Sequence, residues 1–168
     1  APAYTLYHKE LIDGKIVSTS KQNATMLEGI KNQDWDVITI QQGSSHSAKP
    51  DKFTYLQDII DYVNENKTNK DAKIAWHMTW SYKDDSENLH NIYPGMTQMD
   101  MYNGIVNAVQ TKVLTAKGID FVIPAGTAVQ NARVPLGATM NSDNIHLNNV
   151  ANYMVGLLWF EKITGIDL

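Results

Sequence analysis

Trp35-Asp36-Val37-Ile38-Thr39-Ile40-Gln41-Gln42 is a short β-branched run that turns polar at its end. A nearly continuous apolar run of this length is typical of a strand that is covered on both faces. Two similar runs follow at 74–76 and 119–123, and apolar residues recur at helical spacing over 53–63 and 98–116. Because strands alternate with helices, the sequence predicts a parallel sheet with helices on both of its faces.

The sequence also predicts a hairpin and a short helix near the N-terminus and a helix at the C-terminus. Asp13-Gly14, within Tyr4 to Val17, predicts a β-hairpin, because a two-residue turn of this kind needs positive φ. Asn23 is expected to cap a short helix that ends near Asn32. An Ala/Gly/Thr segment and a loop follow the third strand, and the chain closes with an amphipathic helix over 147–158 that Gly165 ends.

Composition narrows the class of protein. The 168 residues, 43% of them hydrophobic, are enough for one domain, so we expect a single domain over 1–168. A net charge of -4 provides no basic field for a phosphate backbone, which argues against nucleic acid as a partner. The absence of cysteine excludes disulfides, thiolate zinc ligands and a cysteine nucleophile. Apolar runs such as Met154 to Phe160 are far shorter than the roughly 20 residues of a membrane span.

Polar segments directly follow all three predicted strands, at 41–44, 77–80 and 124–127. Parallel α/β sheets bind ligands in the loops after the carboxyl ends of their strands. We therefore expect these three segments to meet at one edge of the sheet.

Asp143 and His146 lie in the stretch 142–146, just before the last helix. A tight turn there brings the carboxylate to the imidazole, and such a carboxylate orients a histidine that takes the proton of a nucleophile. The spacing is equally compatible with a helix-capping aspartate beside a surface histidine.

Asp143-Asn144-Ile145-His146-Leu147 followed by a terminal helix resembles the last motif block of the SGNH (GDSL-like) hydrolases. Further segments are similar, in the same order, to a bacterial branch of that superfamily: 35–42, 76–82, 123–133 and 159–165. The resemblance runs from about Tyr4 to Gly165. It implies a three-layer α/β/α flavodoxin-like sandwich and esterase, lipase or carbohydrate O-deacylase chemistry without a cofactor.

In that chemistry a serine attacks the acyl carbon, His146 is the general base and then the general acid, and Asp143 orients it. The resemblance implies that an amide of Gln42 or Gln41 holds the oxyanion, although the Gly-x-Asn pattern of much of the superfamily is absent here. A glutamine at this position also suits the backbone groups of the loop, and that reading stays open.

The nucleophile motif of the superfamily, Gly-Asp-Ser or Gly-Asn-Ser after its first strand, does not occur in the sequence. The chain resembles the C-terminal two-thirds of the domain, so we expect the serine and the N-terminal strand or strands upstream of Ala1. This chain alone is then expected to be inactive. The edge of the 37–40 strand would be open to self-association or to a complementing N-terminal segment. A less favoured alternative uses Ser44, Ser45 or Ser47 as nucleophile with His46 as base.

Four residues are candidates for substrate binding. His77, Trp80 and Tyr82 could line an acyl or carbohydrate pocket, or pack over the edge of the sheet. Arg133 could hold a substrate carboxylate, or pair with an acidic loop. A metal site is not expected, because no compact ligand spacing appears among the histidines and carboxylates of the 77–90 region: His77, Asp84, Asp85, Glu87 and His90.

The sequence therefore favours an SGNH-type serine hydrolase that acts on a small-molecule or carbohydrate ester. The alternative is a non-catalytic carbohydrate- or ligand-binding module on the same fold. A nucleotide-binding flavodoxin-like protein is disfavoured, because no Gly-rich phosphate loop follows any of the strands. The frequent export of the superfamily implies an extracytoplasmic location, periplasmic or secreted.

Overall fold

Three parallel strands form the centre of the computed structural model, which describes residues 4–136 and 140–168. They are β3 (Val37–Ile40), β4 (Lys73–His77) and β5 (Phe121–Ile123), in the spatial order β3-β4-β5. Ile38 pairs with Ile74, and Ala75 pairs with Phe121. The parallel sheet predicted from the β-branched runs is confirmed.

One face of the sheet is covered by α2 (Leu56–Asn66), α4 (Gln98–Ala108) and the π-helical segment η2 (Val109–Val113). Their apolar side chains form the larger core with the central strand. The fully buried members of this core include Ile60, Ile74, Met101, Ile105 and Val113.

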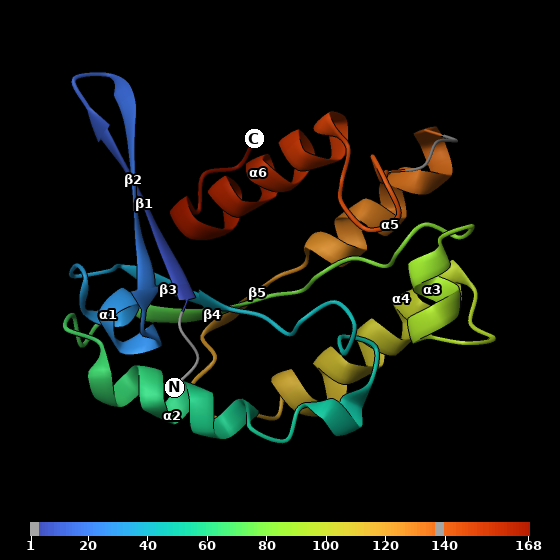
Figure 1. Cartoon of the computed structure of the whole chain (residues 1–168), viewed down its shortest axis with the longest axis horizontal. Coiled ribbons are helices and arrows are strands. Elements are labelled where there is room, and N and C mark those ends of the chain that lie inside the picture. The colour runs from blue at the N-terminus through green and yellow to red at the C-terminus, as the bar shows by residue number, and fades with distance from the viewer. Residues whose placement is uncertain (1–3, 137–139) are drawn as a thin grey trace.

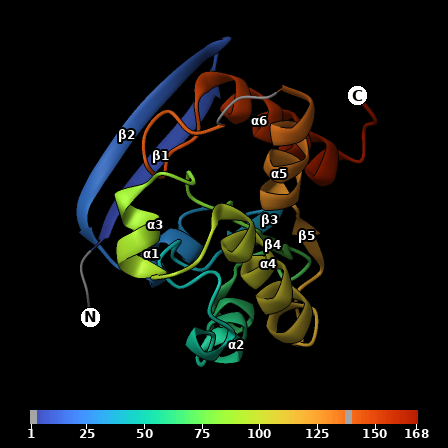
Figure 2. The ribbon, with the colours of Figure 1, turned by 90° about the vertical axis from the view of Figure 1, so that its right-hand side faces the viewer.

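The opposite face is covered by α5 (Ala125–Leu136) and α6 (Asn149–Thr164) (Figures 1 and 2). A smaller core joins them, built on Ala125, Val129, Leu147 and Ala151. Asn148 caps α6 by accepting from the Ala151 N–H, and Gly165 ends it at a φ of 72°. The three-layer α/β/α arrangement is therefore confirmed. No helix of residues 4–136 and 140–168 is long and apolar enough to cross a membrane.

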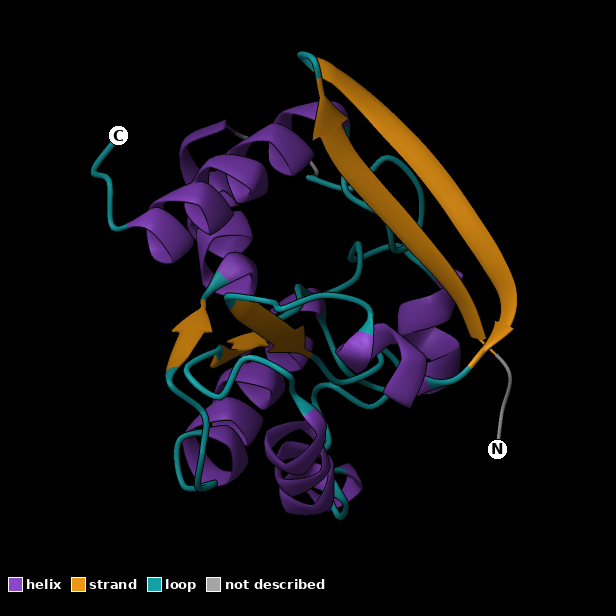
Figure 3. Ribbon diagram, turned by 90° about the vertical axis from the view of Figure 1, so that its left-hand side faces the viewer, coloured by secondary structure: helices purple, strands orange, loops and turns teal. Residues whose placement is uncertain are grey.

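The N-terminal hairpin consists of β1 (Tyr4–Ile12) and β2 (Lys15–Ala24), joined at Asp13 and Gly14. Both turn residues have positive φ, 49° and 75°, as the dipeptide predicted. The two strands form a long ribbon that extends away from the central sheet (Figure 3). The hairpin prediction is confirmed, and β2 runs seven residues beyond the predicted end at Val17.

The prediction that Asn23 caps the first helix is wrong. Asn23 has a φ of 56° within β2, and Thr25 is the N-cap of α1 (Met26–Lys31). Thr25 accepts from the Glu28 N–H, and the Glu28 carboxylate accepts from the Thr25 N–H at 2.7 Å. This reciprocal capping box satisfies two backbone donors at once, which a cap at Asn23 would not do.

The helices α3 (Glu87–Ile92) and α5 and one turn of 3-10 helix, η1 (Pro50–Lys52), lie where the sequence predicted loops. Helix α3 has only six residues. The segment that forms α5 begins with Ala125-Gly126-Thr127 and contains Pro135, so its apolar pattern and its propensity were both weak signals.

Gly126 lets α5 approach the loop after β4. The Gly126 N–H donates to the Met78 carbonyl oxygen at 2.9 Å, and a Cβ at this position would lie 2.1 Å from the Thr79 carbonyl oxygen. The loop after β4 and the segment after β5 therefore meet at the carboxyl end of the sheet. The hydroxyl of Tyr82 reaches Ser44 at 2.8 Å, which brings in the loop after β3, so the predicted meeting of the three loops is confirmed.

We expect Gly126→Ala to destabilise the protein by at least about 2 kcal/mol, because its methyl group would meet backbone rather than a flexible side chain. The matched control is Gly156→Ala in α6, whose added Cβ meets nothing within 4 Å. This control should be neutral or stabilising by up to about 1 kcal/mol. Urea unfolding of both variants measures the difference, and equal free energies of unfolding would contradict the role given to Gly126.

Candidate active site

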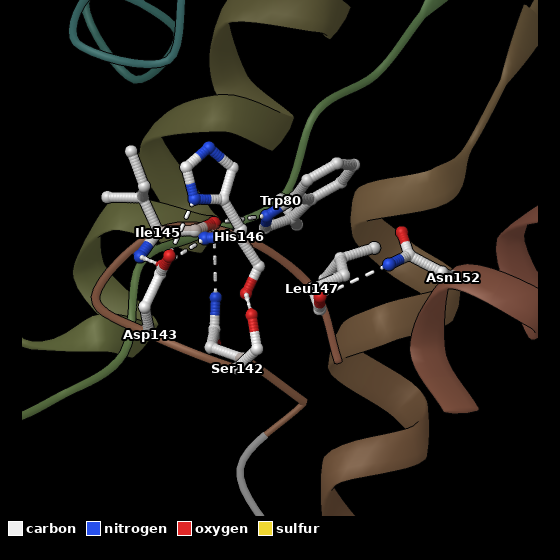
Figure 4. A network of polar contacts seen from close by, with 8 residues as sticks. Trp80, Ser142, Asp143, Ile145, His146, Leu147 and Asn152 are labelled. Atoms are coloured by element: carbon white, nitrogen blue, oxygen red, sulfur yellow. Dashed lines mark hydrogen bonds and ion pairs between the residues drawn. The ribbon is translucent and has the colours of Figure 1, made fainter. Parts of the chain in front are cut away.

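Asp143 and His146 form a hydrogen-bonded pair on the segment between α5 and α6 (Figure 4). Nδ1 of His146 lies 2.7 Å from Oδ2 of Asp143. The other carboxylate oxygen accepts the backbone N–H groups of Ile145 at 2.8 Å and His146 at 2.7 Å. Both oxygens of the aspartate are therefore fixed by the turn that carries the histidine.

These hydrogen bonds also keep Asp143 ionised. The His146 backbone N–H, the His146 side chain and the Ile145 N–H lower the pKa of Asp143 to about 2. An ionised carboxylate only accepts hydrogen bonds, so Nδ1 carries the proton and Nε2 keeps a lone pair. The His146 side chain is 72% exposed, and Nε2 has no hydrogen bond within the part of the chain that the structure describes. The pair presents an accessible base.

Backbone bonds brace the segment that carries this pair. Asn141 and Leu147 form an antiparallel bridge, and the Ser142 N–H donates to the His146 carbonyl oxygen at 2.8 Å. The Trp80 indole N–H donates to the Ile145 carbonyl oxygen at 2.8 Å (Figure 4). Trp80 follows β4, so the loop after the central strand holds the pair in place.

His77 is buried at the end of β4, with 7% of its surface exposed. The indole N–H of Trp159 donates to its Nδ1 at 3.1 Å, and its ring meets Trp80 edge to face at 6.0 Å between centroids. Burial lowers the pKa of His77. A neutral imidazole that accepts at Nδ1 carries its proton on Nε2. Trp80 therefore contacts His77 on one side and the Asp143–His146 segment on the other.

Tyr82 is buried, with 2% exposure, and its hydroxyl donates to the Ser44 Oγ. The nearby Ser47 hydroxyl donates to the Ser44 carbonyl oxygen at 2.9 Å. These two serines are therefore engaged within their own loop, and Tyr82 packs beneath it. We do not count Tyr82 among the accessible groups of the site.

The two glutamines after β3 differ in their surroundings. The Gln42 amide donates to the Lys52 carbonyl oxygen at 2.9 Å and accepts from the Gly43 N–H at 2.9 Å. One Nε2 hydrogen remains available, and Gln42 lines a cavity of about 10 Å³ together with His77. The Gln41 side chain is exposed and makes no hydrogen bond to any residue in the described ranges.

Arg133 lies on α5 and reaches the pair through Asn141. Its Nη2 donates to the Asn141 Oδ1 at 2.8 Å and to the Ser81 carbonyl oxygen at 3.2 Å. Burial lowers the pKa of Arg133, while the nearby Asp84 carboxylate opposes this shift. The guanidinium thus ties α5, the loop after β4 and the segment of the pair together.

Sequence reasoning missed the roles of Trp159 and Asn141. Trp159 is 82 residues from His77 along the chain, and no spacing pattern in a single sequence predicts a hydrogen bond between residues so far apart. Asn141 precedes the recognised motif by two residues and has no signal of its own. Among residues 4–136 and 140–168, no group of three His, Asp or Glu side chains is arranged to hold a metal ion.

The family model for the domain of unknown function DUF4886 matches residues 2–168. The chain belongs to the DUF4886 family. A solved DUF4886 structure from Bacteroides uniformis ATCC 8492 is 31% identical, with a TM-score of 0.82 over 95% of this chain and 62% of that one. The chain therefore spans 62% of the length of this relative.

A candidate SGNH hydrolase from Slackia heliotrinireducens is also similar in structure. It is 16% identical, with a TM-score of 0.60 over 80% of this chain and 68% of that one. At this identity the likeness extends to the fold, and it supports an SGNH-like α/β architecture for this DUF4886 chain. No functionally curated protein matches the chain.

We expect the stability of the protein to fall as the pH drops below about 6.5, partly because of His77. Above that value His77 is neutral in both the folded and the unfolded chain. Below it the unfolded chain takes up a proton that the buried imidazole resists, so unfolding becomes easier. His77→Gln, which keeps an acceptor for Trp159, should reduce the loss of urea midpoint between pH 7.5 and 5.5.

The matched control for this measurement is His90→Gln, because His90 is an exposed histidine on α3. It should leave the pH dependence as in the unmodified chain. An equal loss of urea midpoint between pH 7.5 and 5.5 in the His77→Gln variant and the unmodified chain would contradict the role given to His77.

Proposed function

We propose that the chain provides the acid–base pair of an SGNH-type serine hydrolase that cleaves carboxylic esters, with O-acylated carbohydrates as the favoured substrates. The observation that carries this proposal is the geometry of Asp143 and His146. A carboxylate fixed by two backbone N–H groups holds Nδ1 at 2.7 Å and leaves Nε2 as an accessible base. A capping aspartate would also accept the two backbone N–H groups, but it would not need the contact with Nδ1 of His146.

The chemistry follows from that arrangement. Nε2 of His146 accepts the proton of a serine hydroxyl as its oxygen attacks the acyl carbon, and Asp143 stabilises the resulting imidazolium. The imidazolium then protonates the leaving alcohol oxygen as the ester C–O bond breaks, which leaves an acyl-serine. Water repeats the attack with the same base, and the carboxylic acid is released. Gln41 and Gln42 are the proposed amide donors to the oxyanion.

We place the nucleophilic serine N-terminal to Ala1, outside these 168 residues. The state of Ser47 supports this, because its side chain is buried and its hydroxyl donates to the Ser44 carbonyl oxygen. The Bacteroides uniformis relative is a longer chain, of which the similarity covers 62%, so a protein of this family can carry such an additional segment.

We propose that the segment containing this serine binds along the free edge of β3. β3 has one strand neighbour, β4, among the described residues. An apolar groove of about 530 Å³ lies beside it, between β3, α1 and the start of the hairpin. Its lining includes Leu6, Met26, Ile30, Ile38 and Ile40. An unpaired strand edge next to an apolar groove favours the addition of another strand.

A non-catalytic ligand-binding module on the same fold is the second candidate. The observation that favours it is the partial exposure of Trp80, a ring held in a fixed orientation beside the pair by its indole N–H. Fixed aromatic faces bind ligands without any chemistry.

We expect the protein expressed with its encoded N-terminal extension to hydrolyse 4-nitrophenyl acetate and acetylated sugars. His146→Ala should lower kcat/KM by about a thousandfold or more, and Asp143→Asn should also lower it strongly, because the wrong histidine tautomer is then favoured. The 168-residue chain alone should show no turnover above background.

The control for the histidine is His90→Ala, which should retain full activity. Hydrolysis that survives His146→Ala would contradict the assigned base. Turnover by the 168-residue chain would contradict the placement of the serine, and ligand binding without hydrolysis in the extended protein would favour the binding module.

We also expect the 168-residue chain to self-associate through the β3 edge. Light scattering should give a mass above the 18.8 kDa of one chain. Thr39→Lys, which places a charge on that edge, should shift the mass towards the monomer, whereas Thr111→Lys on the exposed side of η2 should not. A stable monomer of the unmodified chain at all concentrations would contradict the open edge.

A further inference from the structure

A polar pocket of about 320 Å³ lies beside the segment that carries Asp143 and His146. Its lining consists of Lys83, Asp84, Asp85, Gln98 and Arg133. Residues 83–85 lie in the loop after β4, Gln98 is the first residue of α4, and Arg133 lies in the C-terminal half of α5. None of them is in the Asp143–His146 pair.

Two hydrogen bonds fasten this pocket to the segment of the pair. The Lys83 backbone N–H donates to the Asn144 carbonyl oxygen at 3.3 Å. The Arg133 Nη2 donates to the Asn141 Oδ1 at 2.8 Å. A molecule bound in the pocket therefore lies against the turn that presents Nε2.

The charges of the pocket balance. Lys83 and Arg133 contribute two positive charges, and Asp84 and Asp85 contribute two negative ones. Lys83 pairs with Asp85 at 2.9 Å, and the Gln98 N–H donates to the Asp84 Oδ1 at 2.9 Å. An anionic ligand would face two carboxylates, and a cationic ligand would face a lysine and an arginine, so neither sign of charge is favoured.

Hydrogen-bonding capacity is nevertheless left over in this pocket. Nη1 and Nε of Arg133 have no hydrogen-bond partner among the described residues, and Nε is buried. The Asp84 Oδ2 likewise has no partner in residues 4–136 and 140–168. The buried Nε is closed to a ligand, but Nη1 of Arg133 and Oδ2 of Asp84 remain as a donor and an acceptor in a site with no net charge. A hydroxyl group satisfies both, because it accepts from a guanidinium and donates to a carboxylate.

We propose that this pocket binds a neutral, hydroxyl-rich group, namely the sugar that carries the acyl group of the ester substrate. The identification of the sugar as part of the substrate rests on the proposed hydrolase function, whereas the binding of the sugar does not. The partly buried Trp80 contacts the same turn through its indole N–H, so an aromatic ring also lies beside that segment.

The test uses the 168-residue chain with three probes: D-glucose, D-glucuronate and D-glucosamine. Titration is followed by NMR shifts of backbone amides, with further neutral hexoses and pentoses as a panel. We expect at least one neutral sugar to bind with saturating shifts at Lys83, Asp84 and Arg133, and more tightly than its charged analogues. The variant Asp84→Asn keeps Oδ1 for the Gln98 N–H but replaces the acceptor Oδ2 by an N–H donor, so it should weaken this binding by about fivefold to tenfold.

The matched control is Asp51→Asn, the same change at an exposed aspartate outside the pocket. It should bind the sugar like the unmodified chain. Tighter binding of glucuronate would overturn the neutral ligand, and the absence of binding by every sugar would overturn the site. Sugar binding without ester hydrolysis by the extended protein would retain the pocket and reject the proposed function. Hydrolysis of simple acetate esters without sugar binding would retain the proposed function and reject the pocket as a sugar site.

Discussion

The hydrogen bond between the Asp143 carboxylate and the His146 imidazole is the contact on which the functional reading depends. It fixes the tautomer, and the tautomer decides which nitrogen is a base. The two backbone N–H groups on the other carboxylate oxygen hold the aspartate in its charged form. The charge of Asp143 and the orientation of His146 thus follow from one turn of five residues.

The sheet positions the loops that hold this turn in place. Parallel strands end at one edge, and the close approach of Gly126 to the Thr79 carbonyl oxygen keeps the loop after β4 at the start of α5. Trp80 then reaches the Ile145 carbonyl oxygen from the central loop. Arg133 completes the frame from α5 by binding Asn141. The acid–base pair is local in sequence, and its support comes from three distant segments.

The sequence predicted the parts that local rules govern. The β-branched runs identified all three strands, Asp13-Gly14 identified the hairpin, and Gly165 identified the end of α6. It failed where neighbouring signals compete, as at Asn23 and Thr25, and where tertiary packing forms a helix from a weak pattern, as in α5. The pairing of Asp143 with His146 could be expected from three residues of spacing. The bonds of His77 and Arg133 could not, because their partners are chosen by the folded chain.

The short distance along the chain between Asp143 and His146 has a kinetic consequence. Closing a turn of this length costs little chain entropy and takes place much faster than the pairing of parallel strands. The turn can therefore close early in folding, whereas the contacts from Trp80 and Arg133 that hold it form only when the layers pack. In the folded chain the base is held before any ligand binds, so binding energy is not consumed in ordering it.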